Sequence, residues 1–432
     1  MEGKPLVPRL RFPEFRDAPE WELKPLRHIC NINPSDGDLP ERFIYIDLES
    51  VEAGHLKVRN QVQRQEAPSR AQRLLKTGDV VFQIVRPYQR NNLFMNFQGD
   101  KAYVASTGYA QMRAHDSKEF LYQLVHTDGF VSQVISKCTG SSYPAINSSD
   151  LADIPVQIPS SPAEQQKIAE CLTSLDELIA AERRNLEALR TYKKGLMQNL
   201  FPSEGETVPR LRFPEFRDAP GWVEEPFSHL YRFAPTNTFS RDQLSYTSGS
   251  VKNIHYGDIH TRFQVLFNIR REIVPFINPA YLLGEPSPVS LCSEGDMVFA
   301  DASEDLADVG KSIEIIELDG QQVVSGTHTI LAKRKGSHLR IGFGGHLFRS
   351  SRIRTRIQKE SQGSKVLGIS SGRLSIVPVS FPTDHAEQQK IAECLTSLDT
   401  LITAQAKKID TLKSHKQGLM QGLFPSLDEV VA

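Results

Sequence analysis

The chain has 432 residues, of which 39% are hydrophobic and 24% are charged. This length suggests two or three domains, and the hydrophobic share is large enough to exclude a wholly disordered chain. We expect no membrane span and no signal peptide, because no uncharged apolar stretch approaches ~18 residues. The five cysteines form no CxxC pair, which favours reduced thiols over disulfides or a zinc site. The formal net charge of −1 argues against nucleic-acid binding, but it is a sum over the whole chain and does not show where charges cluster.

A leader segment occurs twice, and such internal repeats decide the architecture. VPRLRFPEFRDAPEW at 7–21 returns 201 residues later, at 208–222, with one difference. Its prolines exclude a helix, so its apolar residues predict an extended strap in a hydrophobic groove. The sequence leaves open whether this chain or a partner provides the groove.

A second segment, AEQQKIAECLTSLD, occurs at 163–176 and again, unchanged, at 386–399. The bodies between the repeats share little beyond short strand-like landmarks such as GDVVF (78–82) and GDMVF (295–299). Nearly identical copies should face identical surroundings, whereas divergent copies should face different ones. A recent duplication is the alternative, but it would have left the bodies alike as well.

Both copies of AEQQKIAECLTSLD open a long amphipathic helix. Apolar residues follow alternating steps of four and three, which is the period of a coiled-coil seam. At 1.5 Å per residue each helix spans roughly 55 Å. If a globular body lies between two such helices, antiparallel pairing is expected, and it would give a pseudo-twofold arrangement. The predicted seam positions are Ile168, Leu172, Leu175 and Ile179 in the first helix and Ile391, Leu395, Leu398 and Ile402 in the second.

These patterns predict an α+β chain in which two mixed α/β domains are joined by two long antiparallel coiled-coil helices. The predicted order is a leader repeat at 1–22, a first globular domain at 23–160, a first long helix at 161–202, a linker with the second leader at 203–222, a second globular domain at 223–383, a second long helix at 384–426 and a tail at 427–432.

Positive charge is clustered within the divergent bodies. Residues 54–76 contain six lysines or arginines and a single acid, and Arg86, Tyr88 and Arg90 follow a predicted strand. A second basic run occupies 349–359. Cations on loops with amides and hydroxyls suit DNA phosphates and base edges, although a solvated basic helix face is the simpler alternative for any one residue.

The sequence contains no motif that points to catalysis. It lacks a dinucleotide-binding glycine loop, a P-loop, an HExxH pair and a nucleophile elbow, and no Cys/His set has metal-ligand spacing. We therefore expect a recognition and assembly protein rather than an enzyme, without a metal of its own.

Several of these motifs together resemble the specificity subunit of type I restriction–modification systems. They are LRFPEFRDAPEW (10–21), GDVVF with the following VRP (85–87), GSKVLGIS (363–370) and the EQQKIAECLTSLD opening of each long helix. The resemblance covers essentially the whole chain, in order and twice over.

The resemblance implies that 23–160 and 223–383 are target recognition domains. Each would read one half of an asymmetric, bipartite site on double-stranded DNA, and the helices would set the spacer between the halves. Two methyltransferase subunits and nuclease or translocase subunits are the implied partners in a cytoplasmic phage-defence complex. S-adenosylmethionine, ATP and magnesium would bind those subunits, with no cofactor in this chain.

The second body departs from this family pattern, because 301–305 is acidic where the first body has Arg86 and Arg90. A carboxylate can accept from cytosine but does not hold phosphate. The expected contacts in the second body therefore move to other residues. The complete set of expected DNA-contacting residues is Lys57, Arg59, Arg70, Arg86, Tyr88, Arg90, Ser106, Ser141, Tyr143, Ser325, His328, Arg349, Arg352, Arg354 and Lys365.

Two other functions remain open at this point. A coiled-coil adaptor would use both bodies to bind protein, and its affinity for DNA would not fall steeply with salt. A self-contained nuclease or methyltransferase would be active without partner subunits.

Overall fold

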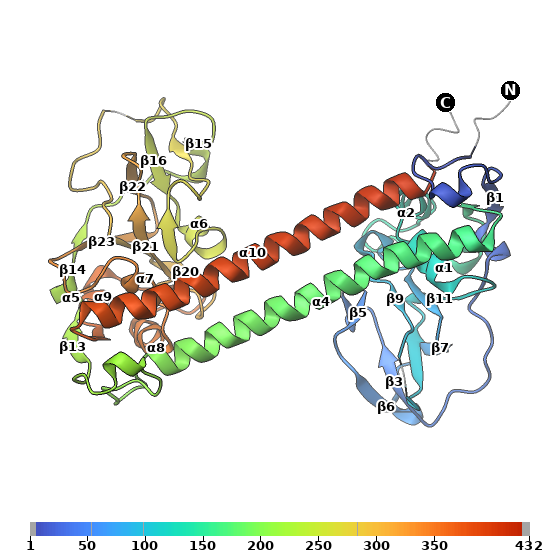
Figure 1. Cartoon of the computed structure of the whole chain (residues 1–432), viewed down its shortest axis with the longest axis horizontal. Coiled ribbons are helices and arrows are strands. Elements are labelled where there is room, and N and C mark those ends of the chain that lie inside the picture. The colour runs from blue at the N-terminus through green and yellow to red at the C-terminus, as the bar shows by residue number, and fades with distance from the viewer. Residues whose placement is uncertain (1–5, 53, 98, 283, 426–432) are drawn as a thin grey trace. The chain divides into compact units, whose positions relative to one another are not determined.

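The computed structural model describes residues 6–52, 54–97, 99–282 and 284–425 (Figure 1). The predicted tail at 427–432 lies outside the described residues. Contacts divide the chain into two compact units: a first unit of Met1–Arg184 with Ala406–Ala432, and a second unit of Asn185–Gln405. Each unit contains one globular body and parts of both long helices, α4 (Pro162–Leu200) and α10 (His385–Leu423).

The body of the first unit contains two four-stranded sheets, with strand orders β6-β3-β10-β7 and β2-β11-β8-β9. Valine, isoleucine and aromatic side chains of the central strands are buried, as β-branched and aromatic residues favour. Their bounds are β2 (Cys30–Ile32), β3 (Arg42–Ile46), β6 (Asn60–Gln63), β7 (Ala71–Leu75), β8 (Val80–Gln83), β9 (Leu93–Phe94), β10 (Tyr103–Ser106) and β11 (Tyr109–Ala114).

Three short helices complete this body, and each begins at a residue whose side chain caps the helix. Ser117, Thr127 and Asn147 accept the capping hydrogen bonds. Phe120 and Phe130 from the first two helices pack into one core with Phe82 of β8. The helices are α1 (Lys118–Leu124), α2 (Asp128–Ser136) and α3 (Ser148–Ala152).

The body of the second unit has a five-stranded sheet, β14-β23-β19-β21-β17, and a four-stranded sheet, β15-β18-β16-β22. Phe299 of β19 packs with Phe227 and Phe348 in the larger core. The strands are β14 (Tyr231–Ala234), β15 (Leu244–Ser245), β16 (Val251–Ile254), β17 (Leu266–Asn268), β18 (Phe276–Ile277), β19 (Met297–Ala300), β21 (Ser312–Glu317), β22 (Gln322–Ser325) and β23 (Thr329–Arg334). The helices are α5 (Phe227–Leu230), α6 (Tyr256–Thr261), α7 (Phe343–Leu347), α8 (Ser351–Glu360) and α9 (Ser371–Ser375).

A small antiparallel sheet links the end of each leader to the strand that precedes each long helix. Glu22 pairs with Ile158 in the first unit, and Val223 pairs with Phe381 in the second. The remaining elements are β1 (Glu22–Pro25), β12 (Pro155–Ile158), β13 (Val223–Pro226), β25 (Pro378–Phe381), β4 (Val51–Glu52), β5 (His55–Leu56), β20 (Ala302–Ser303), β24 (Leu367–Gly368) and the 3-10 helices η1 (Pro13–Phe15), η2 (Leu26–His28), η3 (Arg64–Glu66), η4 (Pro87–Gln89), η5 (Pro214–Phe216) and η6 (Arg241–Gln243).

The two long helices run antiparallel within each unit, and both units use the same ion pair. Lys416 lies 2.7 Å from the carboxylate of Asp176 in the first unit, and Lys193 lies 2.5 Å from Asp399 in the second. Asp399 is the repeat of Asp176, and Lys416 is the repeat of Lys193. Each long helix therefore supplies the aspartate in one unit and the lysine in the other. The predicted mixed α/β fold with two long antiparallel helices is therefore confirmed.

The first seam residues of each helix pack differently from a plain coiled coil. Ile168 and Leu172 belong to the core of the first body, and Ile391 and Leu395 belong to the core of the second. Periodicity identifies an apolar helix face but not the neighbour that covers it, so the sequence could not separate seam from body contacts.

The leaders lie in grooves formed by this chain. In the first unit, the guanidinium of Arg11 donates two 2.8 Å hydrogen bonds to the carboxylate of Glu164, near the start of α4. Trp21 donates to the same carboxylate over 3.3 Å, and the amide of Leu10 donates to the carbonyl of Gly422 in α10. Each strap therefore joins the start of one long helix to the end of the other.

The second leader repeats this arrangement with the helices exchanged. Arg212 donates to Glu387 over 2.8 and 2.7 Å, and the amide of Leu211 donates to the carbonyl of Asn199. The side chains of Arg212 and Glu387 are only 5% and 1% exposed. Hydrogen bonding to the carboxylate of Glu387 raises the pKa of Arg212, so this guanidinium stays charged.

Replacing Glu387 by glutamine should destabilise the second unit strongly, because Arg212 would keep its buried charge without a matching carboxylate. The expected loss is roughly 3 kcal/mol of unfolding free energy, measured by urea denaturation. Glu393→Gln, an exposed position on the same helix, should change stability by less than about 0.5 kcal/mol. Removing both charges together, as Arg212→Met with Glu387→Leu, should recover much of the loss. Equal effects of the two glutamine variants would contradict the assignment.

Candidate nucleic-acid interface

Backbone hydrogen bonds gather several loops at one end of the first body. The amide of Thr107 donates to the carbonyl of Arg70, Ile84 donates to Gly108, and Arg86 donates to Pro144, over 2.9, 3.1 and 2.7 Å. We call this assembly the first tip and define it as Arg70 with residues 84–90, 106–108 and 139–145. It brings together seven of the predicted DNA-contacting residues, from four separate parts of the sequence.

An arginine stacked on a tyrosine dominates the chemistry of the first tip. The guanidinium carbon of Arg86 lies 4.2 Å from the ring centroid of Tyr143. Tyr143 is 65% exposed and Tyr88 is 52% exposed, so both rings face solvent. A guanidinium stacked by its face keeps its edge free for hydrogen bonds, which is the geometry that reads guanine or holds phosphate.

The first tip is held in a strained backbone conformation. Arg86 and Arg90, on either side of η4, have left-handed φ values of 56° and 54°. Such conformations cost non-glycine residues roughly 1 kcal/mol each, so the surroundings must stabilise them. Gln83 donates to the carbonyl of Val85 and to the side chain of Gln89, both over 2.8 Å.

The second body builds an equivalent tip from equivalent segments. The amide of Asp301 donates to the carbonyl of His328, and Ile369 donates to Asp301, as Ile84 does to Gly108 and Ile146 does to Ile84. A Gln362–Gly368 bridge matches the Thr139–Ala145 bridge. We call residues 301–308, 325–328 and 362–368 the second tip.

The side chains of the second tip differ in charge from those of the first. Glu304, Leu306, Lys365 and Val366 are exposed there. Sequence reasoning did not select Glu304, Leu306 and Val366, although aligning the two bodies through GDVVF, GDMVF and the glycine loops would have placed them opposite Pro87, Gln89 and Tyr143.

Burial or internal contacts remove four predicted residues of the second body from the candidate surface. Arg349 donates to the carbonyl of Ser312, and its burial lowers its pKa to about 10. Arg352 pairs with Glu224 over 2.8 Å, and Arg354 donates to the backbone carbonyls of Ala307 and Gly310. Ser325 is fully buried and bonds to Thr329. Of the predicted residues, His328 and Lys365 remain exposed at the second tip.

The predicted residues of the first body divide in the same way. Arg70 is exposed at the first tip with Ser141, whereas Ser106 is buried and accepts from the amide of Gly108. Lys57 forms an exposed ion pair with Glu52, and Arg59 lies over the ring of Phe97, both outside the first tip.

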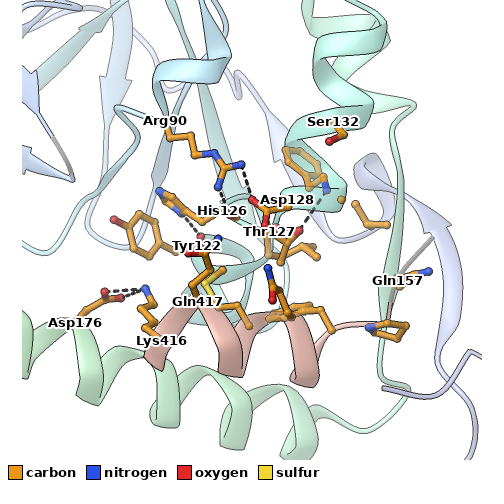
Figure 2. Close-up of a pocket in the computed structure, with 18 of the residues that line it drawn as sticks. Arg90, Tyr122, His126, Thr127, Asp128, Ser132, Gln157, Asp176, Lys416 and Gln417 are labelled. Atoms are coloured by element: carbon orange, nitrogen blue, oxygen red, sulfur yellow. Dashed lines mark hydrogen bonds and ion pairs between the residues drawn. The ribbon is translucent and has the colours of Figure 1, made fainter. Parts of the chain in front are cut away.

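A groove of about 980 Å³ adjoins the base of the first tip (Figure 2). Arg90 points to α2 here and donates to Asp128 over 2.6 Å and to the carbonyl of His126. Burial lowers the pKa of His126 to about 4, so this imidazole is neutral at pH 7. Arg90 therefore anchors the first tip to α2, and its charge is offset within the body.

The described residues contain no group of three or more His, Cys, Asp or Glu that could hold a metal ion. Among the helices in the described part of the chain, none is long and apolar enough to cross a membrane.

Adding a side chain at Gly363 should disrupt the second tip. Gly363 has a φ of 132°, and a Cβ there would lie 1.9 Å from the carbonyl oxygen of Val366. We expect Gly363→Ala to lower the unfolding free energy by more than about 1 kcal/mol and to speed hydrogen exchange at 362–368. Gly372→Ala is the matched control, because its Cβ would meet only Ser370 at 3.9 Å. Unchanged exchange in Gly363→Ala would contradict this geometry.

A family model and several solved structures are similar to this chain. Residues 20–191 match the family model of the type I restriction modification DNA specificity domain. A search of curated proteins gave no significant match. The type I restriction–modification S subunit from M. genitalium has a similar fold, with a TM-score of 0.58 and 13% identity over 98% of this chain and 100% of that chain. A chain solved in work on complex assembly and conformational transition of the type I R-M system gives a TM-score of 0.55 and 18% identity, over 94% of this chain and 97% of that chain. Residues 20–191 thus match the type I restriction modification DNA specificity domain, and the chain shares its fold with solved type I restriction–modification proteins over nearly its whole length.

Proposed function

We propose that the chain is the non-catalytic subunit that gives a type I restriction–modification complex its DNA sequence specificity. Each body is a target recognition domain that reads one half of a bipartite site. The observation that carries this proposal is the pair of tips, which share backbone hydrogen bonds but not side chains. A shared scaffold with divergent side chains is what two readers of different half-sites require.

The repeated surfaces are the proposed docking sites for two methyltransferase subunits. Val7 and Leu10 of the first leader are exposed, as are Val208 and Leu211 at the same positions of the second. The identical openings of the long helices, 163–176 and 386–399, also repeat a hydrogen bond, from Gln166 to Glu170 and from Gln389 to Glu393. Equivalent exposed side chains on two otherwise divergent units indicate two copies of one partner.

Catalysis belongs to the partners in this proposal. The methyltransferase subunits bind S-adenosylmethionine, and nuclease or translocase subunits use ATP and magnesium, in the cytoplasm. The long helices α4 and α10 set the length of the spacer between the two half-sites. A chain of similar fold was solved in work on complex assembly of the type I R-M system, which supports assembly with other subunits.

The dependence of DNA affinity on salt distinguishes this proposal from a protein-binding adaptor. For the chain assembled with methyltransferase subunits, log affinity should fall linearly with log salt concentration. Arg70→Gln should weaken binding across sequences and make the slope shallower by about 1, because it removes one phosphate contact at the first tip.

Arg184→Gln is the matched control, since Arg184 is exposed on α4 and belongs to neither tip. Its slope should equal that of the unmodified chain. An adaptor predicts no steep slope for any of the three proteins, and an Arg70 variant indistinguishable from Arg184→Gln would remove Arg70 from the interface.

A further inference from the structure

The second tip presents an acidic loop at the position where the first tip presents Arg86 and Tyr88. Residues 301–308 contain four acids and no base. Carboxylates repel DNA phosphates, so this loop does not hold the DNA backbone. Under the proposed function, on which this inference rests, the acidic loop must contact a part of the duplex other than its phosphates.

Three of the four carboxylates already face partners within the second body. Asp305 accepts from the amide of Ala307 over 2.8 Å, Asp308 pairs with Lys311 over 3.3 Å, and Asp301 faces His328 at 3.4 Å. Glu304 is exposed, and within the described part of the chain no hydrogen bond or ion pair engages its carboxylate. It is the acid of this loop that is free to meet a ligand.

Helix α8 holds the acidic loop rigidly from behind. The guanidinium of Arg354 donates from Nη2 to the carbonyls of Ala307 and Val309 over 2.9 and 2.6 Å, and from Nη1 to the carbonyl of Gly310 over 2.7 Å. The amide of Gln358 donates to the carbonyl of Leu306 over 3.1 Å. Arg354, which the sequence suggested as a DNA contact, is thus a positioning residue. It orders the loop before any ligand binds, so binding loses less conformational entropy.

A short antiparallel ladder fixes the backbone immediately before Glu304. Ala302 pairs with Gly368 and Ser303 pairs with Leu367. Val366, which precedes Leu367, is 53% exposed and occupies the position that Tyr143 has in the first tip. Glu304 therefore extends toward solvent from a held backbone.

We propose that Glu304 is a specificity-determining residue of the second half-site, and that it accepts a hydrogen bond from the exocyclic amino group of a cytosine in the major groove. A carboxylate only accepts, and cytosine N4 and adenine N6 are the amino donors on the major-groove edges. Adenine places the acceptor N7 beside its amino group and would repel the second carboxylate oxygen. Cytosine has no acceptor at that place.

Methylome sequencing of cells carrying the whole system tests the position that Glu304 reads. Glu304→Ala should relax one position of the second half-site and leave the first half-site unchanged. Glu304→Gln should shift that same position from cytosine toward adenine, because an amide matches the adenine edge. Glu294→Gln is the matched control, since Glu294 is exposed just before β19, whereas the acidic loop follows that strand.

A base-analogue experiment then tests the atom. With the complete methyltransferase complex, replacing the cytosine at the relaxed position by pyrimidin-2-one, which lacks N4, should reduce affinity about 10- to 100-fold. The same analogue should not weaken binding of the Glu304→Ala complex. An unaltered second half-site in Glu304→Ala, or equal losses for both proteins on the analogue, would overturn the inference.

Failure of the proposed function would look different. An unmodified complex that leaves no bipartite methylation motif would contradict the function itself. A bipartite motif whose second half ignores Glu304 would contradict only this assignment.

Discussion

The buried arginine–glutamate pair beneath each leader is the interaction on which the rest of the architecture depends. In the second unit, Arg212 and Glu387 are almost fully enclosed, and Trp222 donates to the same carboxylate. A buried guanidinium without its carboxylate is costly, so the strap must lie where the helix begins. The strap also bonds to the end of the other helix, at Asn199. One interaction therefore fixes the antiparallel register of α4 and α10 in each unit, and with it the position of the body that follows the strap.

That constraint explains why the sequences of the repeats are nearly identical while the sequences of the bodies differ. The residues of the strap, the helix starts and the helix ends contact one another, and a change at one of them leaves another unpaired. The two tips share a set of backbone hydrogen bonds, such as those of Ile84 and Asp301. Backbone bonds do not depend on the side chain, so the tips can exchange an arginine for a glutamate and keep their shape. A fixed frame with variable tips suits a protein that must keep its partners while its target sequence changes.

The sequence predicted the frame better than the interface, and for a physical reason. Repeats and heptad spacing are local patterns, so α4, α10 and their antiparallel pairing follow from them. The basic run at 349–359 was misleading because charge alone does not show which way a helix faces. Arg349 and Arg354 point into the body, where backbone carbonyls rather than water accept their hydrogen bonds. The sequence showed the acidic loop at 301–305 but did not single out Glu304, because the contact of Gln358 in α8 with Leu306, which helps to hold this loop, joins residues 52 positions apart.

The central claim, that the two bodies read separate half-sites from one fixed frame, is tested most directly by replacing one body. Residues 23–160 can be exchanged for the corresponding body of another such chain, with both leaders and both long helices retained. Methylome sequencing of cells carrying the chain with its partner subunits then gives the modified motif before and after the exchange. The account predicts a bipartite motif in which one half changes while the other half and the spacer stay the same. A change in both halves, or in neither, would contradict it.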